Sequence, residues 1–301
     1  MPQSQVRRYD VLSDFNTVYD FLVDTFDLNT FNSYLLPAYW EYLHLHPEFD
    51  YLHAERMGIW RSDDGIVGVV AFDMALGDAH LHPSPSHVYL LPQMLDWTEQ
   101  EISLPITDAS GNFAGNRKLG VWVTDAETSK RELLLNRGYQ LEYREPVRLF
   151  SYSQPFSERA LPPGYRLIQG SEVDPQKLGE FWWQAFENQG PVPASQTDFA
   201  LKLLSAPHGI VDLITVVVSP SGEYASALVM WVDPVNKFAY LEPMATHPKH
   251  RGLGLATVAL TDAMKRSQTH GATMCTGGPP EFYQRIGFQT PMYRERYSKT
   301  F

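Results

Sequence analysis

The sequence predicts an α/β protein made of two domains of similar size, and three observations support this. The chain has 301 residues, whereas one domain usually holds roughly 100–200 residues. A segment with three prolines, residues 151–163, separates two regions of regular hydrophobic periodicity. Both regions consist of alternating strands and helices in one order, which indicates an internal duplication. We therefore expect domains at 1–150 and 164–301, joined by a linker at 151–163.

In the C-terminal half, local sequence patterns predict each helix and strand. Asp174 and Pro175 provide a helix cap and a proline in the first turn, and Leu178, Phe181 and Trp182 follow at helical spacing, which predicts a helix over 174–188. An unbroken β-branched run is typical of a buried strand. In chain order, the remaining patterns predict a strand at 165–168, a helix at 196–204, strands at 212–218, 224–232 and 238–242, a helix at 252–267, a strand at 273–275, a helix at 279–285 and a strand at 292–298.

The N-terminal half can be interpreted in the same order. Its periodic apolar segments predict helices and its β-branched segments predict strands. The expected elements are helices at 12–26 and 32–46, strands at 56–60 and 66–74, a helix at 88–102, a strand at 119–124, a helix at 128–136 and a strand at 147–152.

Composition and charge exclude several classes of protein. A hydrophobic content of 44% excludes a disordered chain. The single cysteine, Cys275, excludes a disulfide framework and a cysteine-based zinc site. Residues 1–150 hold 11 Lys+Arg against 22 Asp+Glu, whereas residues 151–301 hold 13 of each. An acidic chain repels nucleic acid and anionic lipid and suits a cationic substrate, although the acidic residues can equally serve solubility alone.

No targeting segment is apparent behind the two arginines near the N-terminus, Arg7 and Arg8. The longest apolar runs have strand length, far below the roughly 20 residues that a membrane span needs. We therefore expect a cytoplasmic protein that binds neither membrane nor nucleic acid.

One loop carries the clearest chemical signal. After the strand that ends near Leu241, Gly252 and Gly254 lie where a helix begins, and Arg251 precedes them. Consecutive amides at a helix N-terminus bind phosphate oxygens, and glycine lets the ligand approach the backbone. The glycine spacing matches neither the dinucleotide fingerprint nor the P-loop. From these residues alone, an incidental strand-to-helix loop stays an open alternative.

The pattern Arg251-x-x-Gly254-x-Ala256 resembles the acetyl-CoA pyrophosphate loop of the GNAT acyltransferase superfamily. The segment from Phe282 and Tyr283 to Gly287-Phe288 resembles its second motif, a short helix with a tyrosine before Gly-Phe. The resemblance covers residues 164–301. It implies a mostly antiparallel mixed sheet flanked by helices, in which the fourth and fifth strands splay apart.

The resemblance also implies where acetyl-CoA binds and how it reacts. The exposed backbone of Met244, Ala245 and Thr246 would pair with the pantetheine arm. The amides that would hold the pyrophosphate are those of Arg251, Gly252, Leu253, Gly254, Leu255 and Ala256. The amine attacks the thioester directly, with no acyl-enzyme and no metal, and acetyl-CoA serves as cosubstrate.

Two side chains are the candidate catalytic residues. Tyr283 matches the tyrosine that protonates the CoA sulfur in the family, although it can equally be a core aromatic. Glu242 ends the fourth strand and would act as general base, or only hold the substrate ammonium or pair with an arginine. Cys275 has no identifiable activating base and is interpreted as a buried structural residue.

Aromatic and acidic residues at the end of the first helix of this half are weaker candidates for the acceptor pocket. They are Trp183, Phe186 and Glu187, and residues at this spacing are more often part of the core.

The N-terminal half departs from the family at the decisive loop, which would be His80–His87. This loop contains no glycine, and its two prolines remove two amides that a pyrophosphate would need. No tyrosine precedes Gly138 at the matching spacing. We therefore expect residues 1–150 to be a degenerate, non-catalytic copy. Without a carboxylate or cysteine at ligand spacing, its histidines predict no metal.

The expected function is transfer of an acetyl group from acetyl-CoA to a primary amine of a small molecule. The alternatives are a peptide or protein N-acetyltransferase and a non-catalytic acyl-CoA-binding sensor or scaffold. Two fused copies can already supply the contact that single-domain relatives make by dimerising, which slightly favours a monomer. The sequence identifies neither the acceptor nor the acyl chain length.

Overall fold

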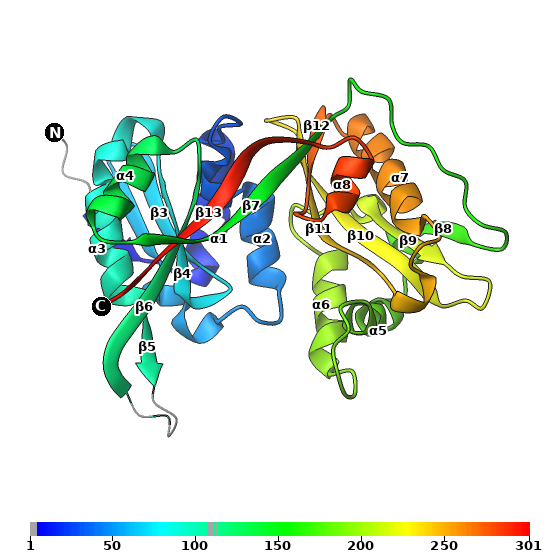
Figure 1. Ribbon diagram of the computed structural model, residues 1–301, viewed down its shortest axis with the longest axis horizontal. Coiled ribbons are helices and arrows are strands. Elements are labelled where there is room, and N and C mark those ends of the chain that lie inside the picture. The colour runs from blue at the N-terminus through cyan, green and yellow to red at the C-terminus, as the bar shows by residue number, and fades with distance from the viewer. Residues whose placement is uncertain (1–4, 108–110, 112) are drawn as a thin grey trace. The chain divides into compact units, whose positions relative to one another are not determined.

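The computed structural model describes residues 5–107, 111 and 113–301. It divides the chain into two compact units, each described separately below (Figure 1). Unit 1 consists of Met1–Leu43, Glu48–Pro146 and Met292–Phe301, and unit 2 consists of His44–Pro47 and Val147–Pro291. Both units are mixed α/β structures with largely antiparallel sheets flanked by helices, which confirms the predicted fold class.

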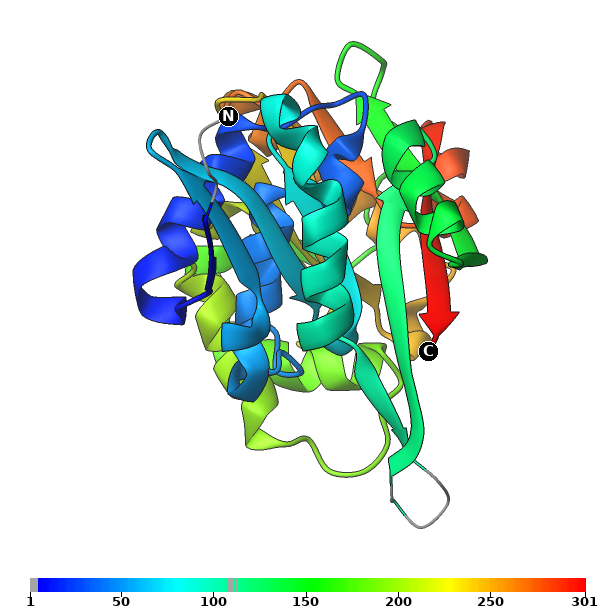
Figure 2. The same cartoon turned by 90° about the vertical axis from the view of Figure 1, so that its left-hand side faces the viewer.

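Among the described residues, the first half of the chain contributes seven strands and four α-helices. The main elements are β1 (Gln5–Arg8), α1 (Val11–Asp24), α2 (Pro37–Leu45), β2 (Gly58–Ser62), β3 (Gly65–Asp73), β4 (Ala75–Pro83), α3 (Leu91–Glu101), β5 (Leu104–Thr107), β6 (Phe113–Thr124), α4 (Thr128–Asn136) and β7 (Gln140–Ser151). Figure 2 shows α3 lying across the strands of unit 1.

The second half repeats the same order without a counterpart of β5. Its elements are β8 (Arg166–Gln169), α5 (Pro175–Ala185), α6 (Ala194–Leu204), β9 (Ile214–Val218), β10 (Tyr224–Asp233), β11 (Phe238–Thr246), α7 (Leu255–Thr269), β12 (Met274–Gly277), α8 (Glu281–Arg285) and β13 (Gln289–Thr300). In unit 2, α7 and α8 lie on one side of β9–β11, and α5 and α6 lie on the other (Figure 1).

In each unit, the sheet includes a strand from the end of the other half of the chain. In unit 1, β13 runs antiparallel to β6 through seven residue pairs, from Arg294↔Thr124 to Thr300↔Lys118 (Figure 2). In unit 2, the last residues of β7 pair with β12, from Met274↔Ser151 to Gly277↔Arg148. The predicted domain boundaries are therefore wrong. Residues 147–163 belong to unit 2, because β7 pairs with β12, and residues 292–301 belong to unit 1, because β13 pairs with β6.

The segment predicted as a linker, residues 151–163, is part of unit 2. Tyr152 is 7% exposed and belongs to the hydrophobic core, and Phe156 and Leu161 pack against that core. These three apolar side chains explain the difference, because the prolines between them set the path of the chain without preventing its burial.

Two predictions for the first half fail. The helix expected over 32–46 begins only at Pro37, because residues Phe31–Tyr34 form a turn with positive φ at every residue. The loop expected at His80–His87 is strand up to Pro83, and both His80 and His82 are buried in β4.

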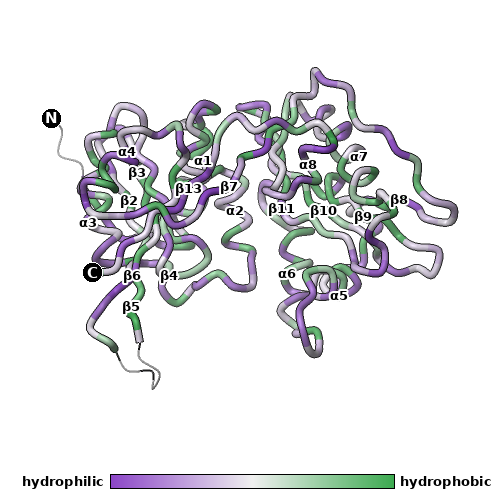
Figure 3. The backbone as a smooth tube through the Cα atoms, in the orientation of Figure 1, coloured by the Kyte–Doolittle hydropathy of each residue, from purple (hydrophilic) through white to green (hydrophobic). Residues whose placement is uncertain are grey.

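The core of unit 2 surrounds β9 and β10, whose residues are all buried. Figure 3 shows how hydrophobic residues concentrate along these strands. Among the described residues, no helix is long and apolar enough to cross a membrane.

Candidate functional site

Two neighbouring parallel strands of unit 2 separate and open a cleft. β11 pairs with β12 only at Phe238↔Met274 and Ala239↔Cys275. It continues beside β10 as far as Thr246, whereas β12 ends at Gly277. This divergence is the splay expected of the fourth and fifth strands. The backbone of the last residues of β11 therefore has no strand partner on the β12 side among the described residues, and lines a cleft of about 1050 Å³.

A bulge in β11 accompanies the separation. Met230 pairs with Leu241 and Leu228 pairs with Met244, so one residue of β10 faces two of β11, Glu242 and Pro243. Such a bulge redirects the strand and its side chains. The indole Nε1 of Trp231 donates a hydrogen bond of 2.7 Å to the Glu242 carbonyl. Met244, Ala245 and Thr246 line the cleft, whereas Glu242 is partly buried outside its lining.

The loop after β11 leads into the N-terminus of α7. Gly252 and Gly254 adopt φ values of 78° and 79°, which favour glycine. Gly254 is the N-cap of this 15-residue helix, and no side chain caps it. The first amides of α7 therefore meet the cleft at the positive end of the helix dipole, an arrangement that suits an anionic phosphate. Gly252, Leu255 and Ala256 line the cleft as well, whereas Leu253 is not part of the lining.

The Arg251 side chain holds the loop rather than standing free in the cleft. Its Nε donates to the Thr246 carbonyl at 3.2 Å and its Nη2 to the Ala185 carbonyl at 3.2 Å. Its Nη1 forms an ion pair with the Glu187 carboxylate. Arg251 thereby connects the end of β11 with the end of α5, and its guanidinium is occupied by these three partners.

A second arginine, which sequence reasoning missed, lies over the same loop. Arg159 lines the cleft, and a Cβ built on Gly254 would lie 2.5 Å from its Nη1. The segment before it is fixed on α7: the Thr261 hydroxyl donates to the Ser157 carbonyl at 2.8 Å, and Lys265 pairs with Glu158 at 2.8 Å. Arg159 therefore places a second positive charge at the cleft beside Arg251, which also lines it. No local pattern marks it, because its position depends on packing against α7.

Tyr283 lies on α8 at the opposite wall of the cleft. The residue is 7% exposed, and its ring packs against that of Phe288 with centroids 5.2 Å apart. Its hydroxyl lies 3.5 Å from the Sδ of Met244, at the splayed end of β11. The structure thus brings the predicted tyrosine together with the predicted pantetheine strand.

Cys275 lies in β12 and is completely buried. Burial raises the pKa of its thiol to about 12. A thiol in this state is a poor nucleophile at neutral pH, in agreement with its interpretation as a structural residue.

The three weaker candidates lie in different surroundings. Phe186 lines the cleft and stacks on Trp182, with ring centroids 5.8 Å apart. Glu187 is bound to Arg251. The indole of Trp183 donates to the Gly190 carbonyl at 3.2 Å and lies outside the cleft lining.

Chemically, the cleft offers a strand edge for amides, a helix N-terminus with a cation for phosphates, and a phenol near the strand edge. Among the described residues, no group of three or more His, Cys, Asp or Glu side chains is arranged to hold a metal ion.

Comparison with known proteins agrees with this geometry. A family model described as the acetyltransferase (GNAT) family matches residues 176–288. Comparison with curated protein sequences found no match.

Solved structures resemble the fold of the whole chain. A tandem GNAT protein from the clavulanic acid biosynthesis pathway has a TM-score of 0.61 and 12% identity over 99% of this chain and 98% of that one. A GNAT-family acetyltransferase from Colwellia psychrerythraea has a TM-score of 0.60 and 15% identity over 98% and 99%. A GCN5-related N-acetyltransferase from Sphaerobacter thermophilus has a TM-score of 0.58 and 14% identity over 99% and 95%. At these identities the likeness concerns the fold alone.

Proposed function

Residues 176–288 form a domain of the GNAT acetyltransferase family, and on this premise we propose that the protein transfers an acetyl group from acetyl-CoA to a primary amine of a small molecule. The observation that carries the proposal is the splayed strand pair beside the uncapped N-terminus of α7. A strand edge and a helix N-terminus along one cleft match the pantetheine amides and the pyrophosphate of one extended cosubstrate.

In the proposed reaction, the nitrogen of a neutral amine attacks the thioester carbonyl carbon. The carbon–sulfur bond breaks, and CoA leaves as a thiolate. Tyr283 protonates that sulfur, since its hydroxyl lies at the splayed end of β11, and its phenolate is reprotonated by the proton that the attacking nitrogen loses as the amide forms. Glu242 accepts the proton that the ammonium group loses, through water. Glu242 itself is not part of the cleft lining, but it lies two residues before Met244, which is, so the proposed proton transfer runs through water.

The acceptor is proposed to be a small amine, and a cationic one suits the acidic chain. Unit 1 is proposed to be non-catalytic, because no glycine lies between the end of β4 at Pro83 and the start of α3 at Leu91, whereas unit 2 carries Gly252 and Gly254 between β11 and α7.

Calorimetric titration with acetyl-CoA tests the cosubstrate site first. We expect one site per chain, and we expect it to be lost in Gly254→Pro, because proline cannot adopt the required φ of 79°. Gly190→Pro is the matched control, since Gly190 has a φ of 84° and lies outside the cleft. Two sites would contradict the silent role of unit 1.

A panel of small amines and amine-bearing peptides then tests the acceptor, with release of free CoA as the readout. Turnover with small amines supports the proposal. Turnover with peptides alone identifies a peptide or protein acetyltransferase instead. Binding of acetyl-CoA without turnover on any amine identifies a sensor or scaffold.

A further inference from the structure

The Met244 side chain crosses the unit 2 cleft between its two diverging strands. Met244 belongs to the splayed end of β11, and the Tyr283 ring lies against Gly277, the last residue of β12. The Tyr283 hydroxyl donates to the Met244 Sδ, and the oxygen and sulfur are 3.5 Å apart. Both residues line the cleft. The contact therefore joins the two sides of the gap that the separation of β11 and β12 opens.

Met244 is the adaptable neighbour of the Tyr283 ring. The rings of Phe282 and Phe288 pack against the ring of Tyr283 with centroids 5.1 and 5.2 Å apart, and a Cβ on Gly277 would lie 2.5 Å from its Cδ1. These neighbours hold the ring in one place. Met244, in contrast, is half-buried at the edge of the core. Its unbranched side chain has three rotatable bonds and fills irregular space.

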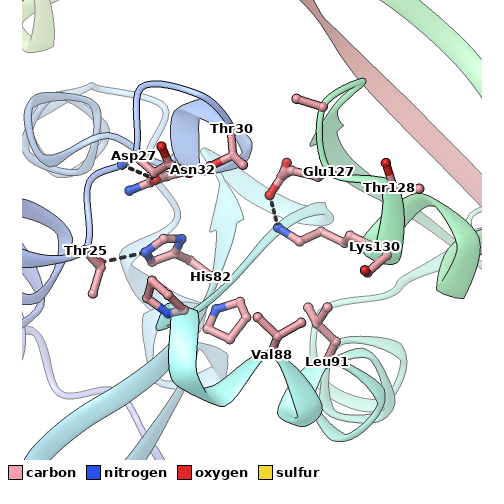
Figure 4. A pocket seen from close by; sticks show the side chains of 14 residues that line it. Thr25, Asp27, Thr30, Asn32, His82, Val88, Leu91, Glu127, Thr128 and Lys130 are labelled. Atoms are coloured by element: carbon pink, nitrogen blue, oxygen red, sulfur yellow. Dashed lines mark hydrogen bonds and ion pairs between the residues drawn. The ribbon is translucent and has the colours of Figure 1, made fainter.

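Unit 1 bridges the corresponding gap with charged groups. There β4 pairs in parallel with β6, as β11 does with β12, and α4 follows β6 as α8 follows β12. The buried Lys130 of α4 donates to the Leu81 carbonyl of β4 at 2.7 Å and pairs with Glu127 at 2.6 Å. Figure 4 shows Lys130 and Glu127 in the wall of the unit 1 pocket.

The two bridges differ in strength. Hydrogen bonds from an ammonium group are among the strong ones, whereas a thioether is a weak acceptor. The bridge of unit 1 is therefore a fixed part of the fold. The contact between Met244 and Tyr283 is one that a ligand in the cleft can displace.

The proposed reaction places the thioester at this contact. If Tyr283 protonates the CoA sulfur, that sulfur must come within hydrogen-bond reach of the Tyr283 hydroxyl. The Met244 Sδ already lies within that reach. The thioester sulfur therefore either displaces the Met244 thioether or lies beside it, and in both cases the Met244 side chain contacts the reacting group.

The acyl chain starts at the same place, because the acyl carbonyl carbon is bonded directly to the thioester sulfur. Each further methylene of a longer acyl group needs room that the Met244 side chain takes up. A shaped apolar pocket discriminates by roughly 10–200-fold for one methylene group. The size of the side chain at position 244 should therefore decide which thioesters fit.

We propose that Met244 is the residue that determines acyl-group specificity, and that its side chain restricts the cosubstrate to acetyl-CoA and other short acyl-CoA thioesters. This role rests on the proposed function, and it adds a side-chain role to the backbone role expected of Met244.

Calorimetric titration of the full chain with acetyl-CoA and butyryl-CoA tests the proposal without an acceptor amine. We expect the wild-type chain to bind butyryl-CoA at least about tenfold more weakly than acetyl-CoA. Met244→Ala opens the space beside Tyr283 and should make the two affinities roughly equal. Met264→Ala is the matched control, because Met264 is 1% exposed in the same core and lies outside the cleft lining.

Met244→Leu separates the size of the side chain from its sulfur. Leucine keeps most of the apolar bulk, so we expect this variant to retain the preference for acetyl-CoA. Equal wild-type affinities, a preference that persists in Met244→Ala, or a preference lost equally in Met264→Ala or Met244→Leu would overturn the proposal.

The wild-type chain offers a second measurement that does not depend on the folding of Met244→Ala. In protein labelled with ¹³C at the methionine methyl groups, the Met244 signal is identified by its loss in Met244→Leu. We expect acetyl-CoA to shift this signal. If calorimetry shows that acetyl-CoA binds and the signal does not move, the role of Met244 is refuted and the proposed function stands. If acetyl-CoA does not bind at all, the proposed function is refuted together with this role.

Discussion

At the scale of single residues, two arginines line the cleft, whereas the sequence predicted a phosphate-binding role for Arg251 alone. Arg251 is bound to α5 and β11, and Arg159 lies over Gly254. We expect Arg159→Gln to weaken acetyl-CoA binding about tenfold, the loss of one hydrogen bond to a charged group. Binding of acetyl-pantetheine, which lacks the pyrophosphate, should not change. Calorimetry with both ligands checks this, with the exposed Arg166→Gln as control. An equal loss for both ligands would refute a phosphate contact.

Another residue makes the stability of unit 1 depend on pH. Burial lowers the folded pKa of His82 to about 3, whereas an unfolded histidine has a pKa of about 6.5. Below that value the unfolded chain binds a proton that the folded chain does not, so the free energy of unfolding falls as the pH falls. The expected slope is about 1.4 kcal/mol per pH unit between roughly pH 6 and 4. Urea unfolding across this window should show a flatter profile in His82→Gln than in the control His87→Gln. Parallel profiles would contradict a neutral buried His82.

At the scale of secondary structure, the end of β12 positions α8. A Cβ on Gly277 would lie 2.5 Å from Cδ1 of Tyr283, so this glycine leaves room for the ring. We expect Gly277→Ala to displace Tyr283 and to lower kcat. Tyr283→Phe should lower kcat as well, and the expected loss is roughly 10²-fold. Acetyl-CoA affinity should change little in Tyr283→Phe. Steady-state kinetics with calorimetry checks both variants, and unchanged turnover in Tyr283→Phe would remove Tyr283 from the mechanism.

Gly68→Ala is the matched control for a methyl group added to a strand glycine. Its Cβ would lie 3.4 Å from the flexible end of Met94, an acceptable contact. A similar loss of kcat in this control would mean that the Gly277 effect is not specific to Tyr283.

Elements whose structure is determined locally were predictable, and those determined by distant contacts were not. The conformation of the loop before α7 depends on residues of the loop itself, such as Gly254, so the sequence motif is enough to predict it. The turn at Phe31–Tyr34 was predicted as helix, because Ser33 is held there by Glu127 and Lys130, about 95 residues away. Arg159 was missed for the same reason, since α7 determines its position.

At the scale of the whole molecule, removal of the C-terminus is expected to affect the first unit. β13 pairs with β6, and the Arg294 guanidinium packs on Trp122 at 3.8 Å and pairs with Asp73 at 3.2 Å. We expect deletion of residues 292–301 to raise hydrogen exchange throughout β2–β6 of unit 1. Exchange in β9 and β10 of unit 2 should stay slow. Hydrogen exchange followed by mass spectrometry checks this, and loss of protection confined to unit 2 would contradict the assignment of β13.

The closing strand of unit 1 also affects the order of events during synthesis. Ribosomes add about 5–20 residues per second, and domains normally fold as they emerge, the N-terminal one first. Unit 1 is complete only when residues 292–301 appear. The strand β6 therefore lacks its partner β13 for about 7–30 s after Pro146 has been made. During that interval the edge of β6 that β13 later covers is unpaired, and an unpaired strand edge favours aggregation.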